Sequence, residues 1–455
     1  MDITGIFEKQ RSYFRQGVTK PYAFRIDALR KLKKAIIEHE KEINEALWKD
    51  LHKSPFEVYM SEVGFILEEI GYHIKHLKKW MKPKRVSSGI TMFPASTYDY
   101  FEPLGTVLII APWNYPFQLT LAPLIGAISA GNTAIIKPSE YSSHTSEIME
   151  KLLTKTFPEE YIKVINGDAK TSQALLKLNF DHIFFTGSPR VGKIVYKAAA
   201  ENMTPVTLEL GGKSPCIVDE TAKLSLAAKR IMWGKLLNAG QTCIAPDYLL
   251  VHQSVKDKLL PLLKQTIENF FGSDPSSNQE YPHIISEANI ERLASLIKDA
   301  EIYYGGQYDR KTKYFQPTIL DNVSFDDPVM QQEIFGPILP VISYNRLEEV
   351  LDIIASKPKP LALYLFSEKN QTQKMVLQRV SAGGATINDT LMHIANNHVA
   401  FGGVGNSGIG GYHGYYSFKT FSNNKPYVKR GTWMDVPIRY APFGKKLAIL
   451  KRLMK

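Results

Sequence analysis

The sequence predicts an α/β protein made of two doubly wound domains and a small β element. Between residues 104 and 210, short β-rich segments alternate with helical patterns, and a second series of the same kind begins at residue 214. Such alternation is typical of a parallel sheet that helices cover on both faces. The chain has 455 residues, which is long for one domain and suits two large domains with a minor third.

The first series is expected to form one parallel sheet. Its predicted strands are Val107–Ala111, Thr133–Lys137, Tyr161–Ile165, His182–Phe185 and Val206–Leu210. Its predicted helices lie near residues 117–129, 143–155, 171–178 and 191–200.

Residues 103–136 carry no charge, so their length alone would permit a transmembrane helix. Prolines and glycines divide this stretch into pieces too short to span a membrane, so we expect buried strands and a buried helix instead.

The second series predicts another sheet of the same type. Its strands are Ser214–Val218, Tyr248–Val251, Ile338–Tyr344, Leu361–Phe366 and Gly384–Asn388, with helices near 222–238 and 255–270. The segment 82–102 fits neither series, because it is polar, rich in turn residues and β-branched. We expect it to form an extended hairpin that projects from the body.

Cysteine usage and the N-terminal residues indicate the compartment. Two cysteines among 455 residues argue against a disulfide framework and favour a reducing environment. The first residues, MDITGIFEKQRSYF, are charged and contain no apolar core of a secretory signal. We therefore expect a cytoplasmic protein.

Positive charge is concentrated in the last 37 residues. Residues 419–455 contain ten Lys and Arg against one acidic residue, Asp435, so this tail carries +9 of the net +11 and leaves +2 for the body. A near-neutral body does not suggest nucleic-acid binding. Leu447, Leu450 and Met454 have helical spacing among basic residues, so the tail lies on an anionic membrane surface, packs across a dimer or forms a solvated end.

The two cysteines occupy different settings. Cys216 lies in the apolar strand segment SPCIVD, which favours a small buried side chain. Cys243 lies in NAGQTCIAPD, where Gly240 and Pro246 bracket a short irregular turn after a helix. A cysteine in such a turn can be partly exposed, which a nucleophilic thiolate requires, although a buried structural cysteine is equally consistent with this segment alone.

Two further polar residues lie where catalytic groups are expected. Glu209 stands between two leucines near a strand end, where a partly buried carboxyl with a raised pKa would suit a general base. Asn114 follows the first strand, at the sheet edge that faces the ligand crevice, where its amide can donate to an oxyanion. A structural ion pair for Glu209 and a turn role for Asn114 are the alternatives.

A cofactor site is indicated by FFTGSPRVGK, residues 184–193, which reads as strand, glycine turn and helix. Gly187 frees the backbone to approach a phosphate, and the helix N-terminus supplies unpaired N–H groups. The segment GVGNSG, 403–408, matches GxGxxG, but no helix or βαβ unit follows it, so we expect a flexible loop beside the substrate. Lys137 and Glu140 suit the hydroxyls of a ribose, and Glu333 in EIFGP is another acid in an apolar setting.

Together these segments closely resemble the aldehyde dehydrogenase superfamily. APWNYP, KPSE, FTGSPRVGK, LELGGKSP, GQTCIAPD, EIFGP and FGGVGNSGIGGYHG occur in the family's order at about its spacing, and they cover residues 100–420. The variants GQTCIAPDY and GGYHGYYSFKTFS resemble the class 3 branch, which acts on fatty and aromatic aldehydes. The family usually has proline before FGG, where this chain has Ala400, so the nearby substrate loop is less predictable.

The resemblance implies a subunit of three parts and a homodimer. The cofactor-binding domain would comprise 1–81 and 103–207, and the catalytic domain 208–415. Residues 82–102 and 416–455 would form the bridging element and the basic tail. NAD or NADP would be the cofactor, an aldehyde the substrate, and no metal ion or nucleic acid is implied.

The resemblance also implies a role for each candidate residue. Cys243 would attack the carbonyl, Asn114 would stabilise the oxyanion, and Glu209 would activate the water that hydrolyses the thioester. The residues implied for the cofactor are Trp113, Lys137, Glu140, Gly187, Ser188, Gly192, Glu333 and Phe335. Those chosen for the substrate tunnel are Tyr115, Trp233, Ile394 and Phe401.

Two other functions are weighed against this one. A CoA-acylating aldehyde dehydrogenase would pass the acyl group to a thiol, but that chemistry does not need a base such as Glu209. A catalytically silent relative would serve as a binding protein, but the joint presence of Cys243, Glu209 and Asn114 argues against it.

Overall fold

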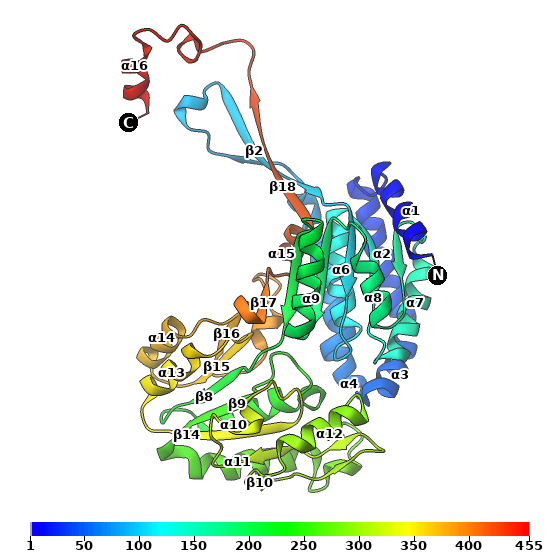
Figure 1. Cartoon of the computed structure of the whole chain (residues 1–455), viewed down its shortest axis with the longest axis vertical. Coiled ribbons are helices and arrows are strands. Elements are labelled where there is room, and N and C mark those ends of the chain that lie inside the picture. The colour runs from blue at the N-terminus through cyan, green and yellow to red at the C-terminus, as the bar shows by residue number, and fades with distance from the viewer. Residues whose placement is uncertain (1, 455) are drawn as a thin grey trace.

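The computed structural model describes residues 2–454, and it contains two large, mainly parallel sheets stacked along the long axis of the molecule (Figure 1). The N-terminal region is helical and packs on the first sheet. Its elements are α1 (Ile3–Arg15), α2 (Tyr22–Glu38), α3 (Glu40–Leu51), α4 (Pro55–Val58), a π-helical turn (Tyr59–Val63) and α5 (Gly64–Trp80).

The first sheet has six strands in the order β17-β7-β6-β3-β4-β5. Five of them are parallel, and β17 joins the edge antiparallel to β7. The strands are β3 (Thr106–Ile110), β4 (Thr133–Lys137), β5 (Ile162–Val164), β6 (His182–Gly187), β7 (Val206–Leu210) and β17 (Gly408–Ile409). The helices between them are α6 (Gln118–Ala130), α7 (Ser143–Thr156), α8 (Ala169–Leu176) and α9 (Pro189–Glu201).

Alternation along β3 shows why this sheet is buried on both faces. Val107 and Ile109 belong to the apolar cluster formed with α5 and α6, whereas Leu108 and Ile110 belong to the cluster formed with α1 and α9. Successive side chains of a strand point to opposite faces, so a strand covered on both sides must be apolar throughout. The charge-free stretch 103–136 is therefore a sheet core. Among residues 2–454 no helix is both long and apolar enough to cross a membrane.

The second sheet has seven strands in the order β10-β13-β14-β9-β8-β15-β16, of which only β10 is antiparallel to its neighbour. The strands are β8 (Pro215–Val218), β9 (Tyr248–His252), β10 (Ile302–Tyr304), β13 (Thr318–Leu320), β14 (Ile338–Tyr344), β15 (Ala362–Phe366) and β16 (Gly384–Ile387). The helices are α10 (Leu224–Leu236), α11 (Gln253–Phe271), α12 (Glu287–Leu296), α13 (Leu347–Ser356) and α14 (Asn370–Arg379). Between β10 and β13 the chain forms a two-stranded hairpin, β11 (Tyr308–Asp309) with β12 (Tyr314–Phe315).

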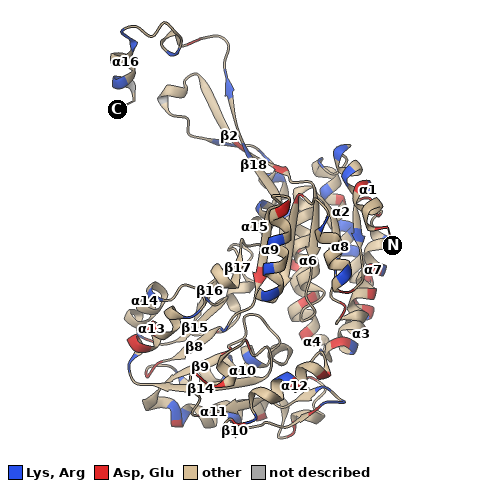
Figure 2. Ribbon diagram, viewed as in Figure 1, with Lys and Arg blue, Asp and Glu red and all other residues tan. Residues whose placement is uncertain are grey.

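A three-stranded antiparallel arm projects from the body (Figure 1). It consists of β1 (Lys84–Val86), β2 (Ala95–Pro103) and β18 (Ser422–Arg430), so the hairpin predicted at 82–102 is completed by a strand 320 residues later. The short helix α15 (Tyr415–Thr420) leads into β18, and α16 (Lys446–Leu453) lies at the far end of the tail. Lys and Arg are spread along β18 and α16 (Figure 2).

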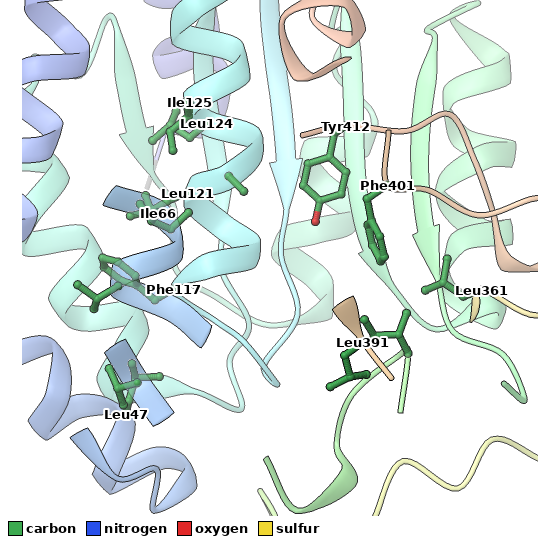
Figure 3. Close-up of a cluster of buried hydrophobic side chains, with 14 of the residues drawn as sticks. Leu47, Ile66, Phe117, Leu121, Leu124, Ile125, Leu361, Leu391, Phe401 and Tyr412 are labelled. Atoms are coloured by element: carbon green, nitrogen blue, oxygen red, sulfur yellow. The ribbon is translucent and has the colours of Figure 1, made fainter. Parts of the chain in front are cut away.

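The largest apolar cluster connects the N-terminal helices, the first sheet and the loops that follow the second sheet. Figure 3 shows part of it, with Leu121, Leu124 and Ile125 of α6 on one side and Leu391, Phe401 and Tyr412 on the other. The two sheets are therefore parts of one packed body, and loops that come late in the chain reach the edge of the first sheet.

The predicted fold class is confirmed, and most predicted elements appear within two residues of their expected ends. One difference matters for the site. The helix expected at 222–238 ends at Leu236, because Asn238 and Ala239 adopt positive φ angles of 52° and 51°. A left-handed pair cannot continue an α-helix, so the chain turns sharply just before Cys243.

Candidate active site

Cys243 lies in the loop between α10 and β9, and it lines an apolar cavity of about 270 Å³. Its side chain is only partly buried, which is one of the two settings that its segment allowed, whereas Cys216 on β8 is fully buried as predicted. Burial raises the pKa of the Cys243 thiol, and the nearby Glu333 and Glu209 raise it further, while the backbone N–H groups of Cys243 and Ile244 lower it.

The four residues expected in a substrate tunnel all line this cavity. They are Tyr115, Trp233, Ile394 and Phe401. The wall also contains Met60, Ser61, Phe65, Gln118, Leu119, Leu237, Thr242, Ile244, Leu391, Met392 and Ala395. Most of these side chains are apolar, which suits an apolar ligand that brings one polar group to Cys243.

Glu209 is a buried carboxyl on β7 that has no hydrogen-bond partner at either oxygen among the described residues. Its exposure is 3%, and burial raises its pKa well above the usual range. An ionised Glu209 raises the pKa of the Cys243 thiol. A buried carboxyl without partners is costly, so it is more readily explained by chemistry than by stability.

Asn114 follows β3 and connects that sheet to the loop of Cys243. Its side-chain amide donates to the carbonyl of Gln241 at 3.0 Å, and its own carbonyl accepts from Asn238 Nδ2 at 2.7 Å. Tyr115, next in the chain, shares a hydrogen bond of 2.7 Å with the Thr242 hydroxyl. Consecutive residues of the APWNYP segment therefore hold the residues directly before Cys243.

Lys137 and Glu140 stand at the carboxyl end of β4, where Lys137 Nζ and Glu140 Oε2 form an ion pair of 2.6 Å. Lys137 is buried, while Glu140 is 40% exposed at its side chain. This edge of a parallel sheet is where doubly wound folds bind nucleotides. Both residues can therefore reach a ligand bound outside the sheet.

The glycine turn predicted at 184–193 joins β6 to α9. Gly187 ends β6, and Ser188 is the N-cap of α9, with its Oγ accepting from Val191 N at 3.4 Å. A Cβ on Gly192 would lie 2.6 Å from Cδ2 of Leu210, so a larger residue here would have to displace the Leu210 side chain between α9 and β7. The helix N-terminus is thereby held at the end of the sheet, as anion binding requires.

Glu333 lines a second cavity of about 450 Å³, together with Pro189 at the start of α9, Lys213 and Asn406. Burial raises the Glu333 pKa to about 8, and the charge of Asp247 contributes. Its Oε1 accepts no hydrogen bond from a described residue, and a Cβ on Gly211 would lie 2.1 Å from its Oε2. An unpaired carboxyl oxygen in a cavity that reaches a helix N-terminus fits the ribose hydroxyls of a dinucleotide.

Phe335 and Trp113 form an aromatic contact. Their ring centroids are 5.4 Å apart with an interplanar angle of 78°, and Phe335 has a positive φ of 50°. Trp113 comes from the loop after β3 and Phe335 from the loop before β14. The contact therefore joins loops of the two sheets next to Asn114 and Glu333.

A network that the sequence motifs did not reveal holds the Glu333 loop. Lys213 forms an ion pair with Asp247 and donates to the carbonyls of Val329 and Gln332 at 3.0 and 2.9 Å. Asp247 accepts from Ile334 N at 3.0 Å. Lys213 and Asp247 lie in the LELGGKSP and GQTCIAPD blocks, but nothing in those blocks indicates that both reach a loop more than 80 residues further on.

Comparison with known proteins agrees with this geometry. The profile of the aldehyde dehydrogenase family matches residues 1–426. The chain is 48% identical over 451 residues to 4,4'-diaponeurosporen-aldehyde dehydrogenase of Staphylococcus aureus (strain NCTC 8325 / PS 47), and the match covers 99% of this chain and 98% of the relative. It is 42% identical to the dimeric NADP-preferring aldehyde dehydrogenase of Canis lupus familiaris, with 97% and 98% of the two chains covered.

The same similarity holds for the fold. The substrate-bound state of AldH from Staphylococcus aureus matches with a TM-score of 0.98 and 48% identity, covering 100% of this chain and 99% of that one. The chain therefore belongs to the aldehyde dehydrogenase family, and its reaction is the oxidation of aldehydes to carboxylic acids with NAD or NADP.

Proposed function

We propose that Cys243 is the nucleophile, Asn114 the oxyanion donor and Glu209 the base that activates water. The Cys243 thiol loses its proton to solvent, and the thiolate adds to the aldehyde carbonyl to form a tetrahedral thiohemiacetal anion, whose oxygen accepts from the Cys243 backbone N–H and from Asn114 Nδ2. Only one hydrogen of that amide is engaged by Gln241, so the other remains for the substrate. NAD or NADP would supply the hydride acceptor when bound, and loss of hydride from the former carbonyl carbon would leave a thioester on Cys243.

Glu209 then completes the reaction by accepting a proton from water, which adds to the thioester and releases the acid. The observation that carries this assignment is the Glu209 carboxyl, which is 3% exposed and has no hydrogen-bond partner at either oxygen among residues 2–454. A transfer of the acyl group to CoA would not need this base.

Burst kinetics test the assignment. Glu209→Gln should release about one equivalent of NAD(P)H per active site and then turn over slowly, because the thioester accumulates. Cys243→Ala should release none, and the control Cys216→Ala should behave like the wild type. A requirement for CoA before any steady-state turnover would reverse the assignment to water.

For the cofactor, we infer that the body formed by 1–81 and 103–207 binds it and that 208–415 carries the reaction. Lys137 and Glu140 would bind the adenosine ribose, and Gly187, Ser188 and Gly192 would lie along the pyrophosphate. Glu333 would bind the nicotinamide ribose, with Phe335 and Trp113 beside the ring. The unpaired Glu333 oxygen and the α9 N-terminus support this orientation.

Medium- or long-chain aliphatic or aromatic aldehydes are the proposed substrates. The support is the apolar wall of the Cys243 cavity, with Tyr115, Trp233, Ile394 and Phe401 among its residues. The Staphylococcus aureus relative is named for one aldehyde, 4,4'-diaponeurosporen-aldehyde.

A homodimer is proposed through the bridging element, residues 82–102 and 416–455. The arm of β1, β2 and β18 leaves the body, and one relative is named as dimeric. Val428 and Tyr427 on β18 are exposed apolar side chains that a second subunit would cover.

The basic tail is proposed to touch an anionic membrane surface from the cytoplasm. Leu447, Ile449 and Leu450 of α16 are exposed beside Lys446, Lys451 and Arg452, and Trp433 and Phe443 are exposed before it. Deletion of 441–455 should abolish co-sedimentation with anionic liposomes, whereas unchanged sedimentation would contradict the membrane contact.

A further inference from the structure

The Cys243 cavity borders a second groove, and the two share part of their walls. Met60, Trp233 and Leu237 line both. The groove has a volume of about 370 Å³, and Cys243 does not line it. The shared residues therefore form a common rim, with the nucleophile on one side and the groove on the other.

Volume indicates that the inner cavity alone is small for a long substrate. It measures about 270 Å³, just under the roughly 300–1,000 Å³ that small-molecule sites commonly have. An aldehyde enters with its carbonyl toward Cys243, so the rest of its chain must point toward the rim. A chain too long for the inner cavity passes Met60 and Trp233 and reaches the groove.

The groove has the surface that a hydrocarbon chain requires. Phe56, Leu236, Phe270 and Phe271 add apolar surface to the three shared residues, and no Lys or Arg lines the groove. Phe56 is 75% exposed, which is unusual for an aromatic side chain without a ligand or partner. Glu57 and Glu280 also line the groove, so a negatively charged chain end is disfavoured there.

Met60, one of the shared residues, lies in an irregular part of the N-terminal helical region. Met60 and Ser61 lie in the π-helical turn Tyr59–Val63, which interrupts the helical run from Pro55 to Trp80. Such single-turn π segments often occur at functional sites because they redirect side chains that an α-helix would place elsewhere. Here Met60 reaches both the inner cavity and the groove.

We propose that this groove, with Phe56 and Phe270 as walls, is a second subsite that holds the distal hydrocarbon of a long, uncharged aldehyde. The inference rests on the proposed attack by Cys243, and it adds a specific place for the part of the chain beyond the inner cavity. The subsite extends the chain-length preference of the enzyme and selects against aldehydes that carry a carboxylate at the far end.

Steady-state kinetics on a series of aldehydes from butanal to hexadecanal test the subsite. In the wild type kcat/KM rises by about fourfold for each buried methylene, first in the inner cavity and then in the groove. Phe56→Glu leaves butanal oxidation unchanged and lowers kcat/KM for hexadecanal by about tenfold or more. Phe56→Leu keeps the long-chain activity, because it keeps apolar surface in the groove.

Tyr59→Glu is the matched control. Tyr59 is 52% exposed in the adjacent helical turn and lines neither the inner cavity nor the groove, so the full wild-type length profile is expected. A long aldehyde with a terminal carboxylate reacts no better than butanal with the wild type. Thermal unfolding of each variant separates a binding effect from a loss of folding.

Three results overturn the subsite: an equal loss by Phe56→Glu on butanal and hexadecanal, the same length-dependent loss by Tyr59→Glu, or efficient oxidation of the carboxylated aldehyde. The proposed chemistry fails in a different way. If Cys243→Ala retains butanal oxidation, the nucleophile is wrong, whatever the length profile of Phe56→Glu.

Discussion

Lys53 and Glu62 form an ion pair of 2.6 Å between Nζ and Oε1, and neither side chain has any exposed surface. Lys53 Nζ also donates to the carbonyl of Asn114 at 2.9 Å and lies 3.9 Å from the centroid of the Tyr115 ring. The second Glu62 oxygen accepts from the backbone N–H groups of Phe117 and Gln118. One buried pair thus holds the segment that carries the proposed oxyanion donor.

We expect Lys53→Met to destabilise the protein by roughly 3–5 kcal/mol, because it leaves the Glu62 carboxylate buried without its counter-ion. Chemical denaturation measures the free energy of unfolding. Lys151→Met is the matched control, because Lys151 pairs with Glu42 at the surface and its loss should cost about 1 kcal/mol or less. Equal losses in the free energy of unfolding for the two variants would show that the buried pair contributes no more to stability than the surface pair.

Glu57 shares this environment and predicts a pH dependence of stability. Burial raises its pKa to about 7 from a usual value near 4.5, although Lys53 and the N–H of Asn238 oppose the shift. Below the pKa of the unfolded state, Glu57 is protonated in both states, and its burial then carries no charge penalty. As the pH rises through about 7, the unfolded state has already lost its proton and the folded state must lose its own, so the free energy of unfolding falls.

In the variant Glu57→Gln the free energy of unfolding should not fall in this pH range, because glutamine does not titrate. Between about pH 4 and about pH 8, its free energy of unfolding should gain about 3 kcal/mol relative to the wild type, since one pKa unit corresponds to about 1.4 kcal/mol. Denaturation curves at several pH values provide the measurement. Parallel pH curves for the two proteins would contradict the raised pKa.

The pH dependence of thioester hydrolysis should report Glu209. A base acts only when ionised, and burial raises the Glu209 pKa well above its usual range, so hydrolysis should increase with pH at a higher pH than an ordinary glutamate would give. Rapid-mixing measurements of acyl-enzyme decay follow this step. Glu209→Gln should remove the increase, and a retained increase would assign the proton transfer to another group.

Cofactor preference should depend on Glu140. If its carboxylate faces the adenosine ribose, it repels a 2′-phosphate, so Glu140→Gln should raise kcat/KM with NADP relative to NAD by about tenfold. Glu147→Gln is a suitable control, because Glu147 is exposed on α7 in the same region. An unchanged ratio would place the adenosine ribose elsewhere.

Strands could be predicted where the sequence itself shows an apolar, β-rich segment between turn residues. Thr133–Lys137 and Val206–Leu210 match β4 and β7 at both ends, because apolar β-rich segments bounded by turns leave little ambiguity. The π-helical turn at Tyr59–Val63 was not predictable, since one extra residue in a helical turn leaves the apolar pattern almost unchanged.

The buried ion pairs could not be predicted from the sequence either. Lys53 and Glu62 look like ordinary surface charges in the sequence, because nothing near them indicates that Asn114 and Phe117 will surround them. The same holds for Lys213 and Asp247, whose partners in the Glu333 loop lie far along the chain. Only folding brings these groups within hydrogen-bond distance.

The sequence by itself determined the fold class, the family and the candidate residues Cys243, Glu209 and Asn114, because each lies in a short segment whose pattern is local. Tertiary structure decided which distant segments line the Cys243 cavity and the groove beside it. The Cys243 cavity and its neighbouring groove combine Met60, Trp233 and Phe270 from separate helices. Contacts between distant segments depend on packing in three dimensions, which no local pattern encodes.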